Sequence, residues 1–300
     1  MTKKKNTPIP ILKPSQFDDY LFAGWKAPIS GFYDRFHVSR IEDYKHHLTL
    51  PLLPHRRSVC FFVFLTQGKV IRSKGLTNYE ITSDSFFFLA ADQITSLEYV
   101  SADAEGFYCH FLPEIFNQSV FKIDFENDFP FFQLTGEPLL KVSDKERFVQ
   151  LLHILENENY RNREERFALI PLYLHTLLSE LKLQMEPAAL KVKNASALLT
   201  QRYKNALSEF IYEKKTVAEF ADYLAVTPNH LHKCVKAATG KSAHHLLDDM
   251  RILEAKVLLK QTDLTIGEIA FKIGRFEPSD FSRFFKTNTG MTPSKYRLSE

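Results

Sequence analysis

Cysteine is scarce in this 300-residue sequence, and long apolar runs are missing from it. The three cysteines, Cys60, Cys109 and Cys234, show no Cys-x-x-Cys or Cys/His spacing, which argues against a disulfide framework and a zinc site. No apolar run is long enough to predict a membrane-spanning helix. The charged N-terminus is not followed by the apolar segment of a signal peptide. We therefore expect a cytoplasmic protein without membrane contact.

Net charge is small, since 39 Lys and Arg face 36 Asp and Glu, but it is unevenly distributed. Residues 195–300 hold 16 Lys and Arg against 12 Asp and Glu, whereas the remainder holds 23 against 24. This distribution is typical of a DNA-binding end attached to a neutral module. With 44% hydrophobic and 25% charged residues, a chain of this length is typical of two globular domains.

Start and stop signals of two short helices lie between residues 265 and 290. Thr265, followed three residues later by Glu268, forms a capping box, which predicts a helix start. Gly274 is expected to end that helix, and Pro278 is typical of the first turn of the next one. Two short helices joined by a tight turn, the second with a small, polar and basic outer face, indicate a helix-turn-helix motif.

The same pattern occurs earlier in the chain. Thr216 and Glu219 form a second capping box, 49 residues before the first, and Pro228 precedes Pro278 by 50 residues. An internal repeat of this kind predicts two helix-turn-helix motifs in tandem. Residues 243–260 are expected to form one longer helix that joins them.

The run from Ile269 to Arg297 closely resembles the C-terminal signature of the AraC/XylS family of transcription regulators. The resemblance covers roughly residues 196–297, and it implies a sequence-specific DNA-binding regulator. Because members of this family are more often activators, it also implies an activator with RNA polymerase as a partner. Two positions depart from the family pattern. Arg275 stands where the family usually has Phe, and Asp280 stands where an aromatic residue or His is more common. Either departure is a reason to expect a change in how the second motif meets DNA.

The second helix of each motif is expected to lie in the major groove, where base edges present a distinguishable pattern of donors, acceptors and methyl groups. The joining helix acts as a spacer, because tandem recognition helices enter groove segments roughly 34 Å apart. Arg283 is the strongest candidate for reading a base, and a solvated helix face is the alternative for every residue of the set. Arg251 is expected to form an internal salt bridge. The predicted contacts to double-stranded DNA are Asn229, His232, Lys233, Lys236, Ser279, Ser282, Arg283 and Lys286.

Phenylalanine is concentrated in the first half of the chain, where 18 of the 27 lie before residue 143. Short strand-like runs alternate there with turn residues, which predicts an all-β sandwich or barrel. Their order resembles the cupin-type N-terminal domain common in the AraC/XylS family. The predicted fold is therefore an N-terminal all-β cupin-like barrel with following helices, and a C-terminal all-α domain of two helix-turn-helix motifs joined by a long helix. The strand-like runs are residues 58–65, 69–73, 79–82, 85–90, 94–100 and 106–112.

Cupin enzymes hold a metal with a His-x-His pair, a Glu and a later His, and this set is incomplete here. His55 is followed by Arg56 and Arg57, so the pair is missing, and no metal, cofactor or catalytic residue is predicted. His55 and His110 remain candidates for lining a pocket, with two unrelated polar side chains as the alternative. The Phe excess also has two interpretations. It lines a cavity for a small apolar or aromatic effector, or it fills a small barrel.

Residues 143–185 show helical periodicity instead. Ser143 and Glu146 form a capping box that predicts a first helix, and a second is predicted over about residues 165–183. The resemblance implies that this region supplies a dimerising helix; the alternative is a helix pair packed on its own barrel. The predicted domains are a cupin-like sensing domain (1–142), the helical pair (143–185), a linker (186–195) and the DNA-binding domain (196–300).

A DNA-binding regulator whose N-terminal domain senses a small-molecule effector or mediates homodimerisation is the leading prediction. One alternative is a cupin-type enzyme that carries a DNA-binding appendage. Another is an effector-free regulator that is controlled by its expression level alone. The missing His-x-His pair argues against the enzyme, so no enzymatic activity is predicted.

Overall fold

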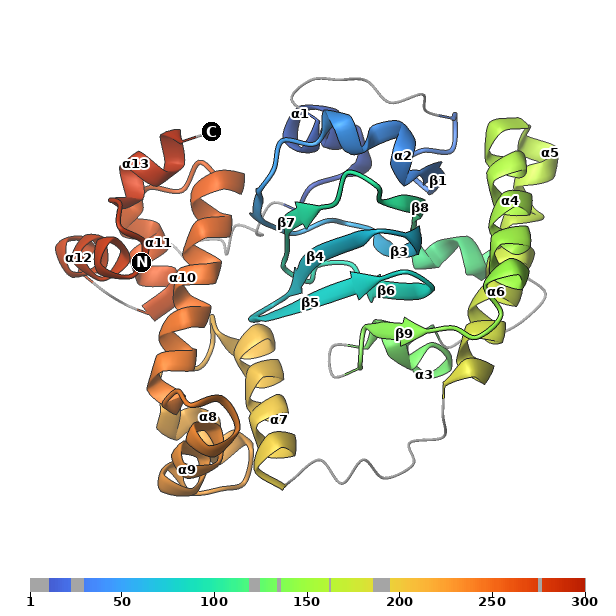
Figure 1. Cartoon of the computed structure of the whole chain (residues 1–300). Coiled ribbons are helices and arrows are strands. Elements are labelled where there is room, and N and C mark those ends of the chain that lie inside the picture. The colour runs from blue at the N-terminus through green and yellow to red at the C-terminus, as the bar shows by residue number, and fades with distance from the viewer. Residues whose placement is uncertain are drawn as a thin grey trace. The chain divides into compact units, whose positions relative to one another are not determined.

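The computed structural model describes residues 11–22, 30–118, 125–133, 136–161, 163–185, 195–274 and 277–299 (Figure 1). The chain divides into two compact units, one built mainly from residues before 186 and the other mainly from residues after 194. Among the described helices, none is both long and apolar enough to cross a bilayer. The predicted linker lies almost entirely outside the described residues.

Two antiparallel sheets form the N-terminal unit. Their strands are β1 (Phe36–Arg40), β2 (Leu52–His55), β3 (Cys60–Gln67), β4 (Lys69–Lys74), β5 (Thr77–Thr82), β6 (Ser85–Leu89), β7 (Thr95–Val100), β8 (Glu105–Phe111) and β9 (Leu139–Lys141). One sheet has the order β1-β8-β3-β6-β9, and the other has the order β2-β7-β4-β5. The six strand-like runs of the sequence correspond to β3 through β8, so their prediction is confirmed.

Alternation along β3 sends its side chains into two different cores. Phe62 and Phe64 lie in a core shared with the helices that follow the sheets, whereas Phe61 and Val63 lie in a core shared with the second sheet. All four side chains are at most 4% exposed. The strand is therefore buried on both faces, which explains its continuous apolar run. These phenylalanines fill the core.

Three helices follow β9 where the sequence pattern predicts two. The first is α4 (Lys145–Arg161), and the predicted second helix is divided into α5 (Glu164–Phe167) and α6 (Ile170–Gln184). Pro171 lies in the first turn of α6, where its missing N–H costs no helical hydrogen bond, so a new helix starts there. The shorter helical segments are η1 (Pro14–Gln16), α1 (Phe17–Leu21), α2 (Ile41–Tyr44), η2 (Lys45–His47), η3 (Pro113–Gln118), α3 (Phe125–Asp128) and η4 (Pro130–Phe132).

The capping box predicted at the start of α4 is wrong. Oδ1 of Asp144 accepts a hydrogen bond from the backbone N–H of Arg147 at 3.1 Å. Ser143 instead donates its hydroxyl to Oε1 of Gln184 at 3.0 Å. Asp is as good an N-cap as Ser, and moving the cap by one residue lets Ser143 connect the start of α4 to the end of α6.

The leucine-rich faces of α4 and α6 are buried within the N-terminal unit. Leu152, Leu155, Leu174 and Leu178 are 0% exposed and belong to the same core as the sheet phenylalanines. These side chains pack within the unit, whereas Ile154 of α4 and Leu183 of α6 are 37% and 80% exposed. The helix pair is packed on its own β domain, and homodimerisation stays a prediction.

Residues 195–298 of the C-terminal unit are mainly helical, and Leu53–His55 of β2 also belong to this unit. Its helices are α7 (Ala195–Phe210), α8 (Val217–Tyr223), α9 (Pro228–Thr239), α10 (Ala243–Gln261), α11 (Ile266–Gly274), α12 (Pro278–Thr289) and α13 (Pro293–Leu298). Helix α10 packs against α7, α8 and α9, and also against α11 and α13. Figure 1 shows α8 and α9 near one end of α10, and α11 and α12 near its other end. The long helix thus joins two helix-turn-helix motifs, as the internal repeat predicts.

Both capping boxes of this unit are present. Oγ1 of Thr265 accepts a hydrogen bond from the N–H of Glu268 at 3.2 Å, and Oε2 of Glu268 accepts one from the N–H of Thr265 at 2.9 Å. The corresponding distances between Thr216 and Glu219 are 3.2 and 2.7 Å. Each box satisfies two backbone donors that a helix start would otherwise leave unpaired.

Replacing Thr265 with alanine is expected to lower the unfolding free energy of residues 195–300 by about 1 kcal/mol, because the N-cap hydrogen bond is lost. Urea denaturation followed by circular dichroism measures the change. Thr287→Ala is a matched control, since Thr287 is an exposed position within α12. The control is expected to be neutral or slightly stabilising. Equal unfolding free energies for the two variants would show that Thr265 does not cap α11.

Candidate nucleic-acid interface and cavity

Helices α9 and α12 are amphipathic, and their apolar faces determine which residues point outward. Leu231 and Val235 of α9, like Phe281 and Phe285 of α12, are 0% exposed. Residues three and four apart share a helix face, so these pairs define the inner side of each helix, and Lys233 and Arg283 between them are exposed. Phe284, which lies next to Phe285 in α12, is only partly buried.

The two helices have the same length and the same type of C-terminal end. Oγ1 of Thr227 accepts a hydrogen bond from the N–H of His230 at 3.2 Å at the start of α9. Gly240 and Gly290 end α9 and α12 with φ angles of 74° and 79°, a left-handed conformation that glycine adopts without strain. Both helices are 12 residues long. Equivalent positions therefore lie at equivalent places on each helix.

The eight side chains predicted to contact DNA occupy matched positions on α9 and α12. Six of them are exposed, and the other two, His232 and Ser282, are partly buried at the same position of each helix. The structure thus brings the set onto two equivalent outer faces, each with two basic residues. The matched pairs are Asn229 and Ser279, His232 and Ser282, Lys233 and Arg283, and Lys236 and Lys286.

Asp280 places a negative charge within the outer face of α12. Its Oδ1 lies 2.8 Å from Nη2 of Arg283, and the two side chains are 55% and 80% exposed. An ion pair so open to solvent is weak, so a DNA group can replace the carboxylate as the partner of Arg283. The corresponding residue of α9, His230, introduces no carboxylate there. The other departure from the family pattern, Arg275, lies outside the described residues together with Phe276.

Arg251 connects α10 to the start of the first motif. Its Nη1 lies 2.9 Å from Oδ1 of Asp248, and its Nη2 donates to the backbone carbonyl of Lys215 at 2.6 Å. The Arg251 side chain is 14% exposed. The predicted internal salt bridge is confirmed, and it holds this guanidinium inside the unit.

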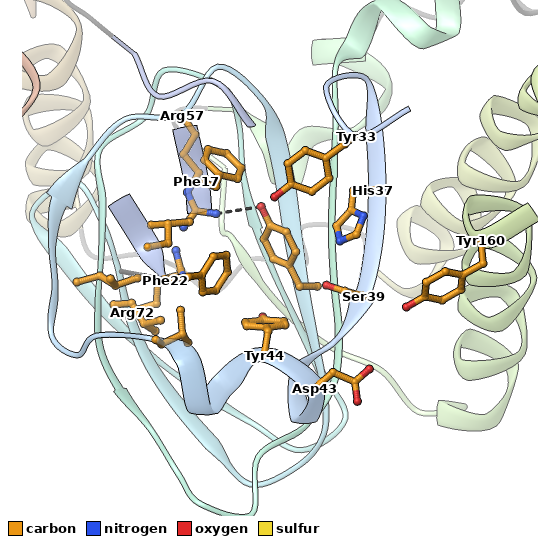
Figure 2. A pocket seen from close by; sticks show the side chains of 15 residues that line it. Phe17, Phe22, Tyr33, His37, Ser39, Asp43, Tyr44, Arg57, Arg72 and Tyr160 are labelled. Carbon is orange, nitrogen blue, oxygen red and sulfur yellow. Dashed lines mark hydrogen bonds between the residues drawn. The ribbon is translucent and has the colours of Figure 1, made fainter. Parts of the chain in front are cut away.

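A cavity of about 80 Å³ lies in the N-terminal unit (Figure 2). That volume is several times the roughly 10–15 Å³ that one water molecule needs. The lining is mostly aromatic and aliphatic, with a few polar groups, which is typical of small-molecule sites. The lining residues are Phe17, Leu21, Phe22, Tyr33, His37, Ser39, Asp43, Tyr44, Leu48, Leu52, Arg57, Arg72, Leu97, Tyr108 and Tyr160.

Neither histidine proposed from the sequence lines this cavity. His110 is fully buried with Nε2 2.7 Å from the carbonyl oxygen of Tyr33, and burial holds its pKa well below the ordinary range. Nδ1 of His55 lies 2.7 Å from the carbonyl oxygen of Leu53. Both are buried polar side chains, the alternative interpretation of the sequence. Within the described ranges, no group of three or more His, Cys, Asp or Glu side chains is arranged to hold a metal ion.

Three buried polar residues of the lining come from separate parts of the N-terminal unit. His37 of β1 and Arg72 of β4 are each 4% exposed, as is Arg57, which lies between β2 and β3. Nη1 of Arg57 donates to the hydroxyl of Tyr108 at 2.9 Å, the bond drawn in Figure 2. Nη1 of Arg72 donates to Oγ1 of Thr95 at 3.3 Å. Sequence analysis did not single out these three as site residues.

Comparison with known proteins supports the interpretation of the C-terminal unit. A family model described as "Helix-turn-helix domain" matches residues 220–299. The uncharacterized HTH-type transcriptional regulator YisR of Bacillus subtilis (strain 168) is 28% identical over 128 residues, 43% of this chain. That match spans only 45% of the length of YisR.

Two further similarities extend over most of the chain. The HTH-type transcriptional activator RhaR of Enterobacter sp. (strain 638) is 22% identical over 250 residues, which cover 81% of this chain and 86% of RhaR. The solved structure of ToxT from Vibrio cholerae matches at 16% identity and a TM-score of 0.39, and it covers 88% of this chain and 98% of ToxT. The tandem motifs and the match over residues 220–299 together identify this part of the C-terminal unit as a helix-turn-helix domain.

Proposed function

We propose that this chain is a sequence-specific DNA-binding transcription regulator, in which α9 and α12 enter successive segments of the major groove. The observation that carries the proposal is the pairing of exposed polar and basic side chains at equivalent positions of the two helices. The two faces repeat at an offset of 50 residues, so the two helices present similar side chains at equivalent places. Two recognition helices on one rigid spacer suit successive groove segments.

Each outer face carries the side chains needed for reading bases and for binding phosphates. Asn229 can form two hydrogen bonds with adenine, and Arg283 can form two with guanine. Lysines at the far end of each helix, Lys236 and Lys286, add positive charge for the phosphate backbone. In this proposal base contacts specify the sequence and phosphate contacts position the protein.

Binding by residues 190–300 alone tests this proposal, because that unit has a hydrophobic core of its own. Selection from a random duplex library, followed by gel-shift titration, is expected to enrich one sequence with two half-sites about one helical turn apart. A variant that lacks the basic pair of each face, with Lys233, Lys236, Arg283 and Lys286 all changed to Ala, is the control. If no sequence is enriched over random DNA, the proposal is wrong.

The cavity of the N-terminal unit is proposed to bind a small effector that modulates DNA binding. Its mostly apolar lining with convergent polar groups supports this role. We further propose that the regulator acts as an activator with RNA polymerase as its partner. A reporter gene placed behind the selected DNA site tests the direction of regulation, since an activator raises transcription and a repressor lowers it.

Changing Asp280 to Asn is expected to strengthen binding to all DNA sequences by about 0.2–1 kcal/mol, because a negative charge leaves the DNA-facing side of α12. The same change releases Arg283 from its ion pair. Gel-shift titration at constant salt measures the effect. Glu213→Gln serves as the control, since Glu213 is exposed but lies outside both recognition helices. Weaker binding by the Asp280→Asn chain would indicate that the carboxylate itself contacts DNA or positions Arg283.

A further inference from the structure

Two buried arginines line the cavity of the N-terminal unit. Arg57 and Arg72 are each 4% exposed, and their guanidinium carbons lie 4.8 and 5.0 Å from the centre of the Phe61 ring. Figure 2 shows both on the same side of the cavity. The two cations are therefore neighbours in aromatic surroundings. A charge in such surroundings is costly unless an opposite charge and hydrogen bonds compensate it.

Compensation of the Arg72 charge by the protein is incomplete. Among the described residues, Nε of Arg72 has no hydrogen-bond partner. The titratable groups that act on it are Arg57, Tyr44 and Tyr108, none of which is a carboxylate. Burial, and then the charge of Arg57, lower the pKa of Arg72 to about 9. Arg72 is thus still a cation at neutral pH, but one held without a counter-charge.

The other polar groups of the cavity do not supply that counter-charge. Asp43 belongs to the lining but is exposed, and Figure 2 shows it beyond Tyr44 and pointing away from both arginines. Burial lowers the pKa of His37 to about 4, so this side chain is uncharged at neutral pH. Its Nδ1 has no hydrogen-bond partner within the described ranges. The cavity therefore carries an excess of positive charge beside a neutral imidazole.

We propose that the cavity binds a small organic monocarboxylate with an apolar body, held by the guanidinium of Arg72. This inference rests on the effector role of the cavity proposed above. A carboxylate matches the planar fork of a guanidinium with two parallel hydrogen bonds. Arg57 adds a second positive charge from a position fixed by Tyr108.

The aromatic lining specifies the rest of the ligand. Phe17, Phe22 and Tyr44 border the cavity together with several leucines, so a ligand body of carbon and hydrogen replaces water on these surfaces. An inorganic anion would compensate the arginines but would leave the aromatic surfaces hydrated. A neutral apolar molecule would cover those surfaces but would leave Arg72 without its counter-charge. The carboxylate with an apolar body satisfies both.

Calorimetric titration of the full-length chain with matched carboxylates and amides tests the proposal. Benzoate is compared with benzamide, hexanoate with hexanamide, and inorganic phosphate is titrated separately. We expect each carboxylate to bind at least about tenfold more tightly than its amide, the factor that charge-assisted hydrogen bonds supply. The comparison of benzoate with hexanoate separates an aromatic from an aliphatic preference, and either result supports the proposal.

Variants of Arg72 distinguish ligand binding from a structural role. Arg72→Met is expected to abolish the preference for carboxylate over amide, and to raise or maintain the melting temperature because a buried charge is replaced by an apolar chain. Arg72→Lys keeps the charge but loses the planar fork, so intermediate affinity is expected. Arg35→Met is the control, since Arg35 also stacks on a phenylalanine but lies outside the cavity.

Four results would overturn the proposal. They are equal affinities for carboxylate and amide, phosphate affinity as high as that of the carboxylates, a carboxylate preference that survives in the Arg72→Met variant, and absence of any carboxylate binding at millimolar concentration. These titrations contain no DNA, so a negative result does not contradict DNA binding by residues 190–300. A negative result in the DNA-binding test likewise does not contradict the carboxylate site.

Discussion

Replacing Phe285 with alanine is expected to lower the unfolding free energy of residues 195–300 by about 3–5 kcal/mol, the cost of removing a fully buried phenylalanine ring. Its side chain is 0% exposed and lies 5.9 Å from the ring of Phe281 and 5.5 Å from that of Tyr296. These rings join α12 and α13 to α10 and α11. The substitution therefore leaves a cavity where four helices meet.

Phe284→Ala is the matched control for this prediction. Phe284 is adjacent on the same helix but only partly buried, so its loss is expected to cost less than about 2 kcal/mol. Urea denaturation of both variants, followed by circular dichroism, gives the two values. Equal losses would mean that the second motif is packed differently, with Phe284 as much a part of its core as Phe285.

The C-terminal unit could be predicted from the sequence because its signals are local. A capping box such as Thr265 with Glu268 needs only residues three apart, and the glycine that ends α9 needs only its own φ angle. Strands β3 to β8 were predictable for a similar reason, since turn residues separate each apolar run from the next. Local patterns of this kind fix the type of an element and its approximate bounds.

Elements that depend on distant partners could not be predicted. Strand β1 pairs with β8, where Phe36 lies opposite Phe111, and the short β9 pairs with β6. Neither strand has a run long enough to indicate a strand by itself, because the hydrogen bonds that stabilise it come from residues far along the chain. The burial of α4 and α6 likewise follows from the tertiary packing of their faces.

The cavity shows the same limit for site residues. His37, Arg57 and Arg72 are far apart in the sequence, and only the sheet arrangement brings them together. One signal was present in the sequence. Arg72 follows Val70 by two residues in a strand-like run, so both lie on one face of that strand. A charged residue on an apolar strand face indicates either a buried ion pair or a ligand site, and choosing between them requires the tertiary structure.

Replacing Arg283 with alanine is expected to weaken binding to the preferred DNA site by about 1–3 kcal/mol and to relax the preference mainly at one base pair. The planar guanidinium matches O6 and N7 of guanine, a geometry that a lysine cannot reproduce. Arg283 is 80% exposed, and the ion pair with Asp280 that it must give up is weak. Most of the energy of a guanine contact is therefore retained.

Lys286, three residues further along α12, is the matched comparison because its loss should have a different signature. It lies nearer the C-terminal end of the helix, where we expect it to face phosphate rather than base edges. Lys286→Ala should weaken all sequences alike and lower the slope of log affinity against log salt by about 0.9. Titration of both variants against single-substitution sites at two salt concentrations separates the two profiles. If Arg283→Ala weakens every site equally, Arg283 contacts phosphate instead of a base. Ser279 and Ser282, near the start of α12, are then the remaining candidates for base contacts.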